Sequence, residues 1–143
     1  MNILLVEDNP GDVRLTREAL KEGGFRQEVE LMVVPDGEQA MRYLNKEAPY
    51  QNVFTPDLIF MDLNLPRLDG REVLKRIKTD PRFKTIPVVI LTTSEAVKDI
   101  RYSYELHANC YITKPVDISQ FIDVIKSIEN FWFTIVKLPT HPS

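Results

Sequence analysis

Leu58-Ile59-Phe60-Met61-Asp62 places four large apolar residues directly before a carboxylate. A continuous apolar run of this length is typical of a strand that is buried on both faces, as in a parallel sheet. In α/β proteins, ligands bind at the carboxyl ends of such strands. Asp62 is therefore a candidate functional residue, and the rest of the chain indicates what surrounds it.

Four other apolar runs of strand length occur along the chain, at 3–6, 29–34, 88–91 and 110–112. Each run is followed by a segment that we predict to be helical. Strands that alternate with helices predict a doubly wound parallel sheet, here with five strands and five helices. The predicted helices begin at Pro10, with Asn9 as N-cap, cover 36–44, begin at Asp69, cover 95–107, and begin at Asp117.

Length and composition limit the function. The 143 residues suffice for one domain, and the net charge of -3 argues against a broad nucleic-acid surface. The lone Cys110 cannot form an intramolecular disulfide, which suits the cytoplasm. No apolar run approaches the ~20 residues of a membrane span. We expect a cytoplasmic protein without a nucleic-acid or membrane partner.

Charged and hydroxyl residues follow four of the predicted strands. Glu7 and Asp8 follow the first strand, Asp62 the third, Thr92 the fourth and Lys114 the fifth. Because the carboxyl ends of parallel strands meet at one edge of the sheet, we expect these side chains in one pocket. Clustered carboxylates repel one another unless a cation lies between them, and Mg²⁺ prefers oxygen ligands. The pattern predicts a Mg²⁺ site in which a carboxylate attacks a phosphoryl group.

Each of these residues has an ordinary explanation when taken alone. A Glu-Asp pair after a strand is usually a solvated loop, and an aspartate there is commonly a helix cap. Ser94, at the end of a Thr-Thr-Ser segment, is able to cap the next helix. Only the combination, with each member at the end of a different strand, favours a functional site.

The combination resembles the motifs of bacterial response-regulator receiver domains. Residues 58–66, followed by Asp69-Gly70, resemble the phosphoacceptor segment of that family, and Lys114-Pro115 also matches in position. The resemblance covers residues 1–130 and implies a flavodoxin-like sheet with strand order 2-1-3-4-5. It also implies a signalling protein, rather than an enzyme in the usual sense, that accepts a phosphoryl group from a sensor histidine kinase.

The resemblance assigns roles in phosphoryl transfer to four residues. Asp62 would be the phosphoacceptor, and Asp8 would bind Mg²⁺ directly. Glu7 would assist the ion through water, and Asn64 would supply its backbone carbonyl to the metal.

The resemblance also implies a switch. Lys114 would pair with the phosphoryl group, Thr92 would turn toward it, and Tyr111 would change orientation with Thr92. The Lys114–Pro115 peptide bond would be cis. Thr93 departs from the family pattern, in which alanine or glycine is usual, and we expect its side chain to crowd the path of the phosphoryl group.

The last residues, 131–143, are predicted to form a helix extension and tail. Three consecutive aromatic residues on a helix cannot all face one core. They would form either a lid over the protein's own core or, as we expect, an interface made by Phe131, Trp132, Phe133 and Val136. This segment resembles that of the cyanobacterial phytochrome response regulators. The resemblance implies a homodimer, a bacteriophytochrome as the kinase, and a phosphotransfer protein as a possible downstream partner.

The sequence argues against three alternatives to a working receiver. A phosphatase of the haloacid dehalogenase type would need an acid two residues after its nucleophile, where this chain has Asn64. A flavodoxin-like FMN carrier would need hydroxyl groups after the first strand, where Glu7 and Asp8 would repel phosphate. A degenerate receiver that binds a partner constitutively would lack part of the functional set, whereas Asp62, Thr92 and Lys114 are all present here.

Overall fold

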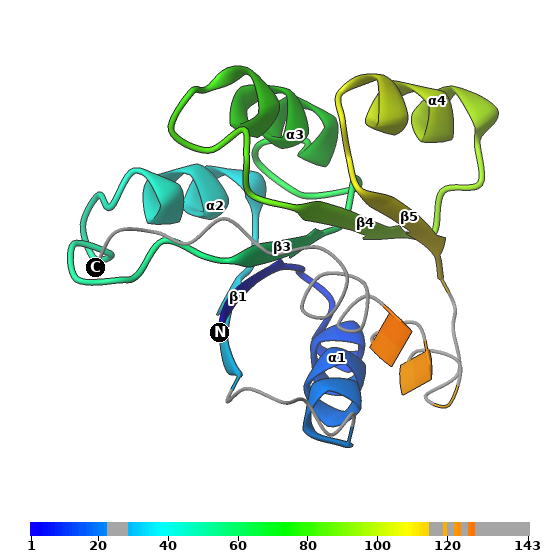
Figure 1. Ribbon diagram of the computed structural model, residues 1–143, viewed down its shortest axis with the longest axis horizontal. Helices are drawn as coiled ribbons and strands as arrows, with labels where there is room; N and C mark the ends of the chain where they lie inside the picture. The colour runs from blue at the N-terminus through cyan, green and yellow to red at the C-terminus, as the bar shows by residue number, and fades with distance from the viewer. Residues whose placement is uncertain (23–28, 115–118, 120–121, 124–125, 128–143) are drawn as a thin grey trace.

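The computed structural model describes residues 1–22, 29–114, 119, 122–123 and 126–127 (Figure 1). Five strands alternate with four helices in these residues. The predicted fifth helix falls mostly outside them, as do the Lys114–Pro115 peptide bond and the predicted interface at 131–136. The elements are β1 (Asn2–Val6), α1 (Pro10–Glu22), β2 (Glu30–Val34), α2 (Gly37–Leu44), β3 (Leu58–Met61), α3 (Gly70–Thr79), β4 (Val88–Thr92), α4 (Val97–Glu105) and β5 (Cys110–Thr113).

The sheet is parallel throughout and has the predicted order β2-β1-β3-β4-β5. Val6 at the end of β1 is level with Met61 at the end of β3. Thr92 at the end of β4 is level with Thr113 at the end of β5. The next residue in each strand therefore emerges at the same edge, where the chain order reverses between β1 and β3.

Helices cover both faces of the sheet. Figure 1 shows α1 on one face and α2, α3 and α4 on the other. Successive strand residues point to opposite faces, so Leu4 and Val6 pack beneath α2 and α3, whereas Ile3 and Leu5 pack against α1. Two apolar cores result, which is why β3, at the centre of the sheet, is apolar and buried at every position. No helix among the described residues has the length and apolar character needed to cross a membrane.

The starts of the four helices among the described residues follow the sequence prediction to within one residue, with one exception. The Asn9 side chain accepts a hydrogen bond from the Gly11 N–H at 2.8 Å, which confirms it as the cap of α1. Helix α4 covers 97–105 instead of the predicted 95–107. The Ser94 hydroxyl accepts from the Ala96 N–H at 3.3 Å and so lies before the helix. His107 has φ of 65°, a left-handed conformation that ends a helix.

Gly70 permits a close approach between α3 and the loop that follows β3. Its N–H donates to the Leu63 carbonyl at 2.9 Å. A Cβ at this position would lie 2.2 Å from the Asp62 carbonyl oxygen and 2.6 Å from Leu63 Cα. These neighbours are backbone atoms, so no rotamer change relieves the clash. The Asp69-Gly70 pair thus caps α3 and holds it directly against the segment that carries Asp62.

An ion pair joins α3 to α4. Arg71 Nε and Nη2 donate to the two carboxylate oxygens of Asp99 at 2.8 and 2.7 Å. These hydrogen bonds, with a further one from Ser94, lower the pKa of Asp99 to about 2. Asp99 and Ser103 are the buried residues of α4, so the inner face of this helix is polar. The ion pair therefore replaces the apolar stripe that normally holds a helix on a sheet.

We predict that Gly70→Ala lowers the free energy of unfolding by about 2–4 kcal/mol, because the Cβ must displace backbone next to Asp62. Urea unfolding measures the change. Gly11→Ala is the matched control: its Cβ would meet only the Asn9 side chain, at 3.2 Å. That variant should stay within about 1 kcal/mol of the wild type. Equal effects of the two variants would contradict the close-approach argument.

Asp99→Asn should lower the free energy of unfolding by about 2 kcal/mol at pH 7, because it removes the charge from a buried pair. The folded pKa lies below the ordinary value, so the stabilisation is present above about pH 4 and is lost as the pH falls through about 2. Urea unfolding between pH 7 and pH 2 checks both points.

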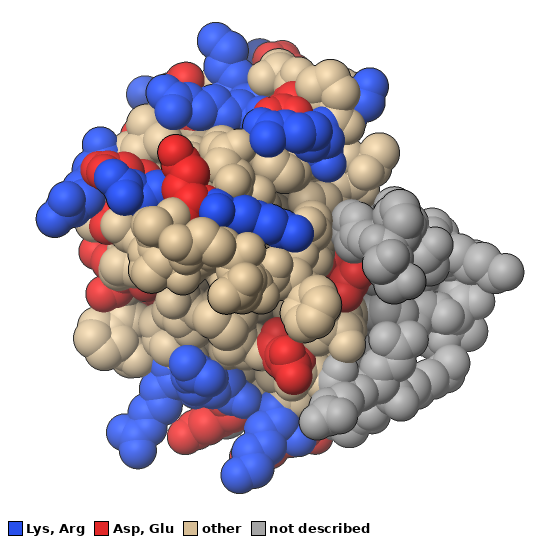
Figure 2. Space-filling view, turned by 90° about the vertical axis from the view of Figure 1, so that its left-hand side faces the viewer, with Lys and Arg blue, Asp and Glu red and all other residues tan. Residues whose placement is uncertain are grey.

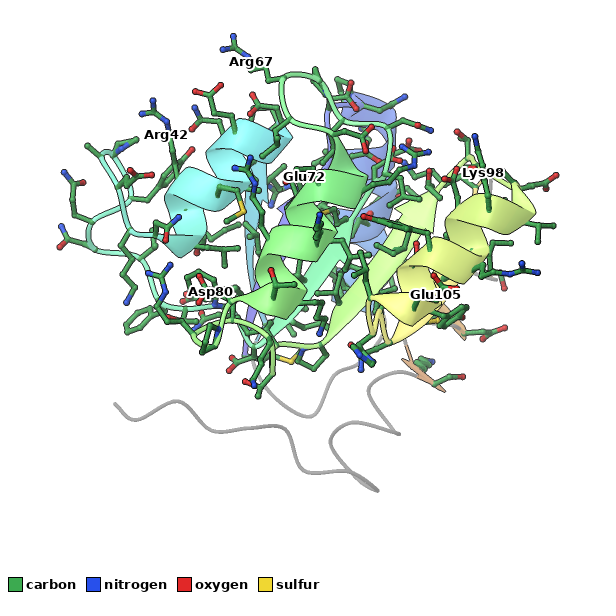
Figure 3. The ribbon with its side chains drawn as sticks, turned by 90° about the horizontal axis from the view of Figure 1, so that it is seen from above. Arg42, Arg67, Glu72, Asp80, Lys98 and Glu105 are labelled. Atoms are coloured by element: carbon green, nitrogen blue, oxygen red, sulfur yellow. The ribbon has the colours of Figure 1, made fainter. Side chains whose placement is uncertain are left out.

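Glu72→Gln provides the control for this variant. Glu72 pairs with Arg76 on the exposed surface of α3, between α2 and α4 (Figure 3). An exposed pair contributes about 0.5 kcal/mol or less. If Glu72→Gln lowered the free energy of unfolding as much as Asp99→Asn, burial of the Arg71–Asp99 pair would not explain its contribution to stability.

Candidate functional site

Three carboxylates meet at the carboxyl edge of the sheet. Glu7 and Asp8 follow β1, and Asp62 follows β3. Each offers one carboxylate oxygen, and these oxygens lie within 4.8 Å of one another. The level ends of β1 and β3 produce this proximity. The structure thus brings together the carboxylates that the sequence predicts.

The Lys114 ammonium lies among carboxylates at the same edge. Its Nζ donates to Glu7 Oε1, to Asp12 Oδ2 at 2.9 Å and to Asp62 Oδ2 at 3.3 Å. An ammonium has three N–H donors, so each has an acceptor here. Burial by itself would lower the pKa of Lys114, but the hydrogen bonds to Asp12 and Glu7, together with the negative charges of Glu7 and Asp62, outweigh it, and the pKa is raised. Lys114 is therefore a fixed cation in this site.

Glu7 and Asp8 differ in exposure although they are adjacent. Glu7 is buried, and its Oε2 accepts from the Asp8 N–H at 3.1 Å. Burial raises the pKa of Glu7 to about 7, against the opposing effect of its hydrogen bond to Lys114. Asp8 is exposed. The pair thus offers one carboxylate held inside the site and one on its solvent side.

Asp62 is buried and held from two sides. Its Oδ1 accepts from the Asn64 N–H at 3.0 Å, and its Oδ2 accepts from Lys114. The loop after β3 therefore folds back on the carboxylate that it carries. Asn64, which the sequence analysis assigned to the metal through its carbonyl, contacts Asp62 through its N–H.

The predicted switch residues meet at Ser94. Thr92 is fully buried, and its Oγ1 accepts from the Ser94 N–H at 3.4 Å. The Tyr111 hydroxyl donates to the Ser94 carbonyl at 2.9 Å. The Ser94 hydroxyl donates to Asp99 at 2.6 Å. One residue of the β4–α4 loop thus connects the hydroxyls of β4 and β5 to the ion pair that holds α4. Thr93, beside it, is exposed.

Sequence reasoning missed Asp12. It lies in the first turn of α1 and not at the end of a strand, where the predicted candidate residues lie. The first turn of a helix that follows a strand begins at the same edge of the sheet. An acidic residue in that turn was the available signal.

The donor set fits a divalent cation. Carboxylate oxygens are the ligands that Mg²⁺ and similar hard cations prefer. The carboxylates of Glu7, Asp8, Asp12 and Asp62 outnumber the one ammonium of Lys114. The excess negative charge favours a further cation, and Glu7, Asp8 and Asp62 lie close enough to share it.

Known proteins resemble this chain in sequence. The family model for the response regulator receiver domain matches residues 3–126. Response regulator Rcp1 of Synechocystis sp. is 47% identical over 137 residues, which cover 96% of this chain and 92% of Rcp1.

Solved structures of related proteins resemble this chain in fold as well as in sequence. The phosphorylated cyanobacterial phytochrome response regulator RcpA is 51% identical and matches with a TM-score of 0.88 over 97% of this chain and 98% of its own. The Mn²⁺-bound form of Rcp1 is 47% identical and matches with a TM-score of 0.86 over 97% of this chain and 99% of its own. The chain therefore belongs to the family of response regulator receiver domains, as its strand-end residues predict.

Proposed function

We propose that Asp62 accepts a phosphoryl group from a sensor histidine kinase in a Mg²⁺-dependent reaction. The observation that carries this proposal is the position of Asp62, a buried carboxylate that contacts the Lys114 ammonium beside Glu7 and Asp8. A carboxylate in such surroundings has the groups needed to balance the charge of an incoming phosphoryl group.

In the proposed reaction, an oxygen of Asp62 forms a bond to phosphorus as the bond to the donor nitrogen of the kinase histidine breaks. The product is an acyl phosphate on Asp62. Glu7, Asp8, Asp62 and the carbonyl of Asn64 would hold Mg²⁺, which when bound neutralises charge on the phosphoryl oxygens. Lys114 lies 3.3 Å from Asp62 Oδ2 and would transfer that hydrogen bond to a phosphoryl oxygen.

Phosphorylation would change the structure of α4 through Ser94. We expect the Thr92 hydroxyl to turn toward a phosphoryl oxygen on Asp62, which would release the Ser94 N–H that it now accepts from. Tyr111 and Asp99 both bind Ser94, so a shift of this residue would alter the exposed surface of α4. Partner proteins would bind that surface in one of its two states. Thr93 would affect only the rates of phosphoryl transfer and loss.

The names of the relatives support a phytochrome as the kinase, since RcpA is a cyanobacterial phytochrome response regulator. A phosphotransfer protein is the proposed recipient downstream, and the cytoplasm is the proposed location. Basic and acidic side chains are intermixed on the face shown in Figure 2, in keeping with a protein partner and not a nucleic acid. The domain would catalyse only the gain and loss of its own phosphoryl group.

We further propose that residues 131–143 extend the 1–130 receiver domain and form a homodimer interface. The sequence supports this proposal, because three aromatic residues are consecutive at Phe131, Trp132 and Phe133, and Val136 follows them. Aromatic residues are enriched at the cores of protein interfaces.

Incubation with acetyl phosphate and Mg²⁺ should add one phosphoryl group to the wild type, detected by intact mass. EDTA should prevent the addition, because the carboxylates then lack the divalent cation. Asp62→Asn should take up no phosphoryl group, whereas Glu95→Gln, which changes an exposed residue after β4, should behave as the wild type. Phosphorylated Asp62→Asn would rule out the assigned acceptor.

Replacement of Phe131, Trp132 and Phe133 by serine should convert a dimer to a monomer in light scattering, because it removes the apolar contact. Phe54→Ser is the control, since Phe54 is another aromatic residue and is 70% exposed. A dimeric mass in the triple variant would place the interface elsewhere.

A further inference from the structure

We propose that Asp12 is a positioning residue for Lys114. It would hold the ammonium in place for phosphoryl transfer when Glu7 and Asp62 bind the metal ion or the phosphoryl group. The inference rests on the proposed function of Asp62 and adds a residue to it. It comes from the three hydrogen bonds of the Lys114 ammonium, of which the one to Asp12 joins α1 to the end of β5.

Asp12 contacts Lys114 closely, and hydrogen bonds fix the backbone of Asp12. Asp12 Oδ2 lies 2.9 Å from Lys114 Nζ, nearer than Asp62 Oδ2 at 3.3 Å. The backbone of Asp12 is fixed on both sides: its N–H donates to Asn9 Oδ1 at 3.2 Å, and its carbonyl accepts from the buried Thr16 hydroxyl at 2.8 Å. Asp12 thus offers Lys114 an acceptor on a well-anchored turn of helix.

Two sets of carboxylates overlap in this site. The set able to hold a divalent cation is Glu7, Asp8 and Asp62, and Asp12 is outside it. The set bonded to the ammonium is Glu7, Asp12 and Asp62. Glu7 and Asp62 therefore serve both cations, whereas Asp12 is the member that serves the ammonium alone.

This overlap defines what Asp12 does. A carboxylate that binds a metal ion, or that becomes an acyl phosphate, has less negative charge to offer an ammonium. Lys114 would then depend on Asp12 for its position, while its remaining N–H groups become free for phosphoryl oxygens. Without Asp12, the lysine side chain would be held by fewer contacts when the phosphoryl group arrives. Poor placement of a reacting group slows a reaction considerably.

The test combines Asp12→Asn with Lys114→Gln in a double-mutant cycle on the full chain. The rate of phosphorylation by acetyl phosphate is followed by intact mass at saturating Mg²⁺, and Mg²⁺ affinity is measured by calorimetry. Asp12→Asn should slow phosphorylation about tenfold and change Mg²⁺ affinity less than about threefold. In the Lys114→Gln background, Asp12→Asn should have no further effect, because its partner is gone.

Two further variants separate positioning from helix stability. Asp12→Glu retains the charge and should restore the rate to within about threefold of the wild type. Glu18→Gln removes a charge from an exposed site on the same helix and should leave the rate unchanged. Urea unfolding of each variant verifies the fold, and Asp12→Glu tests the contact even where Asp12→Asn is poorly folded.

Several results would overturn the inference. An unchanged rate in Asp12→Asn would mean that Lys114 needs no anchor on α1. Equal slowing in the presence and absence of Lys114 would mean that Asp12 acts through another group. A fall in Mg²⁺ affinity of more than about threefold in Asp12→Asn would make Asp12 a metal ligand. A wild type that gains no phosphoryl group would overturn the proposed function as well, whereas a phosphorylated wild type with any of the first three results would overturn this inference alone.

Discussion

The structure depends on one buried ammonium among carboxylates at the edge of a parallel sheet. Lys114 contacts Glu7, Asp12 and Asp62, which lie directly after β1, in the first turn of α1 and directly after β3. Burying either sign of charge alone would be costly, but the opposite charges compensate one another. The arrangement requires strands of matched register, since a one-residue slip would turn a side chain to the other face of the sheet. The position of the fifth strand, which carries Lys114 at its end, is thus as important to the site as the position of Asp62.

Backbone packing and hydrogen bonds connect this charge cluster to the surface. Gly70 allows α3 to approach the backbone of Asp62 more closely than any side chain would permit. Ser94 bonds Thr92, Tyr111 and Asp99, so it is the junction between the site and α4. Helix α4 is held by the Arg71–Asp99 ion pair and presents polar residues inward. A helix held by directional bonds has defined alternative positions when one bond is exchanged, which suits a signalling surface.

Much of this arrangement follows from the sequence, for identifiable reasons. The apolar strands and their ends placed Glu7, Asp8, Asp62 and Lys114 together, because parallel strands end at one edge. Asp12 escaped prediction because its contact depends on the direction of a helix turn rather than on a strand end. The triple role of Ser94 and the inward charge of Asp99 depend on side-chain directions, which sequence spacing does not determine.

We propose that Glu7 and Asp62 serve two cations, the Lys114 ammonium and a divalent metal ion. A crystal structure of the protein with Mg²⁺ and beryllofluoride, which imitates a phosphoryl group on Asp62, tests this most directly. We predict Mg²⁺ among Glu7, Asp8 and Asp62, with Lys114 bonded to Asp12 and to a fluoride. Mg²⁺ at a different site, or Lys114 still bonded to both Glu7 and Asp62, would show that the two cations do not share these carboxylates.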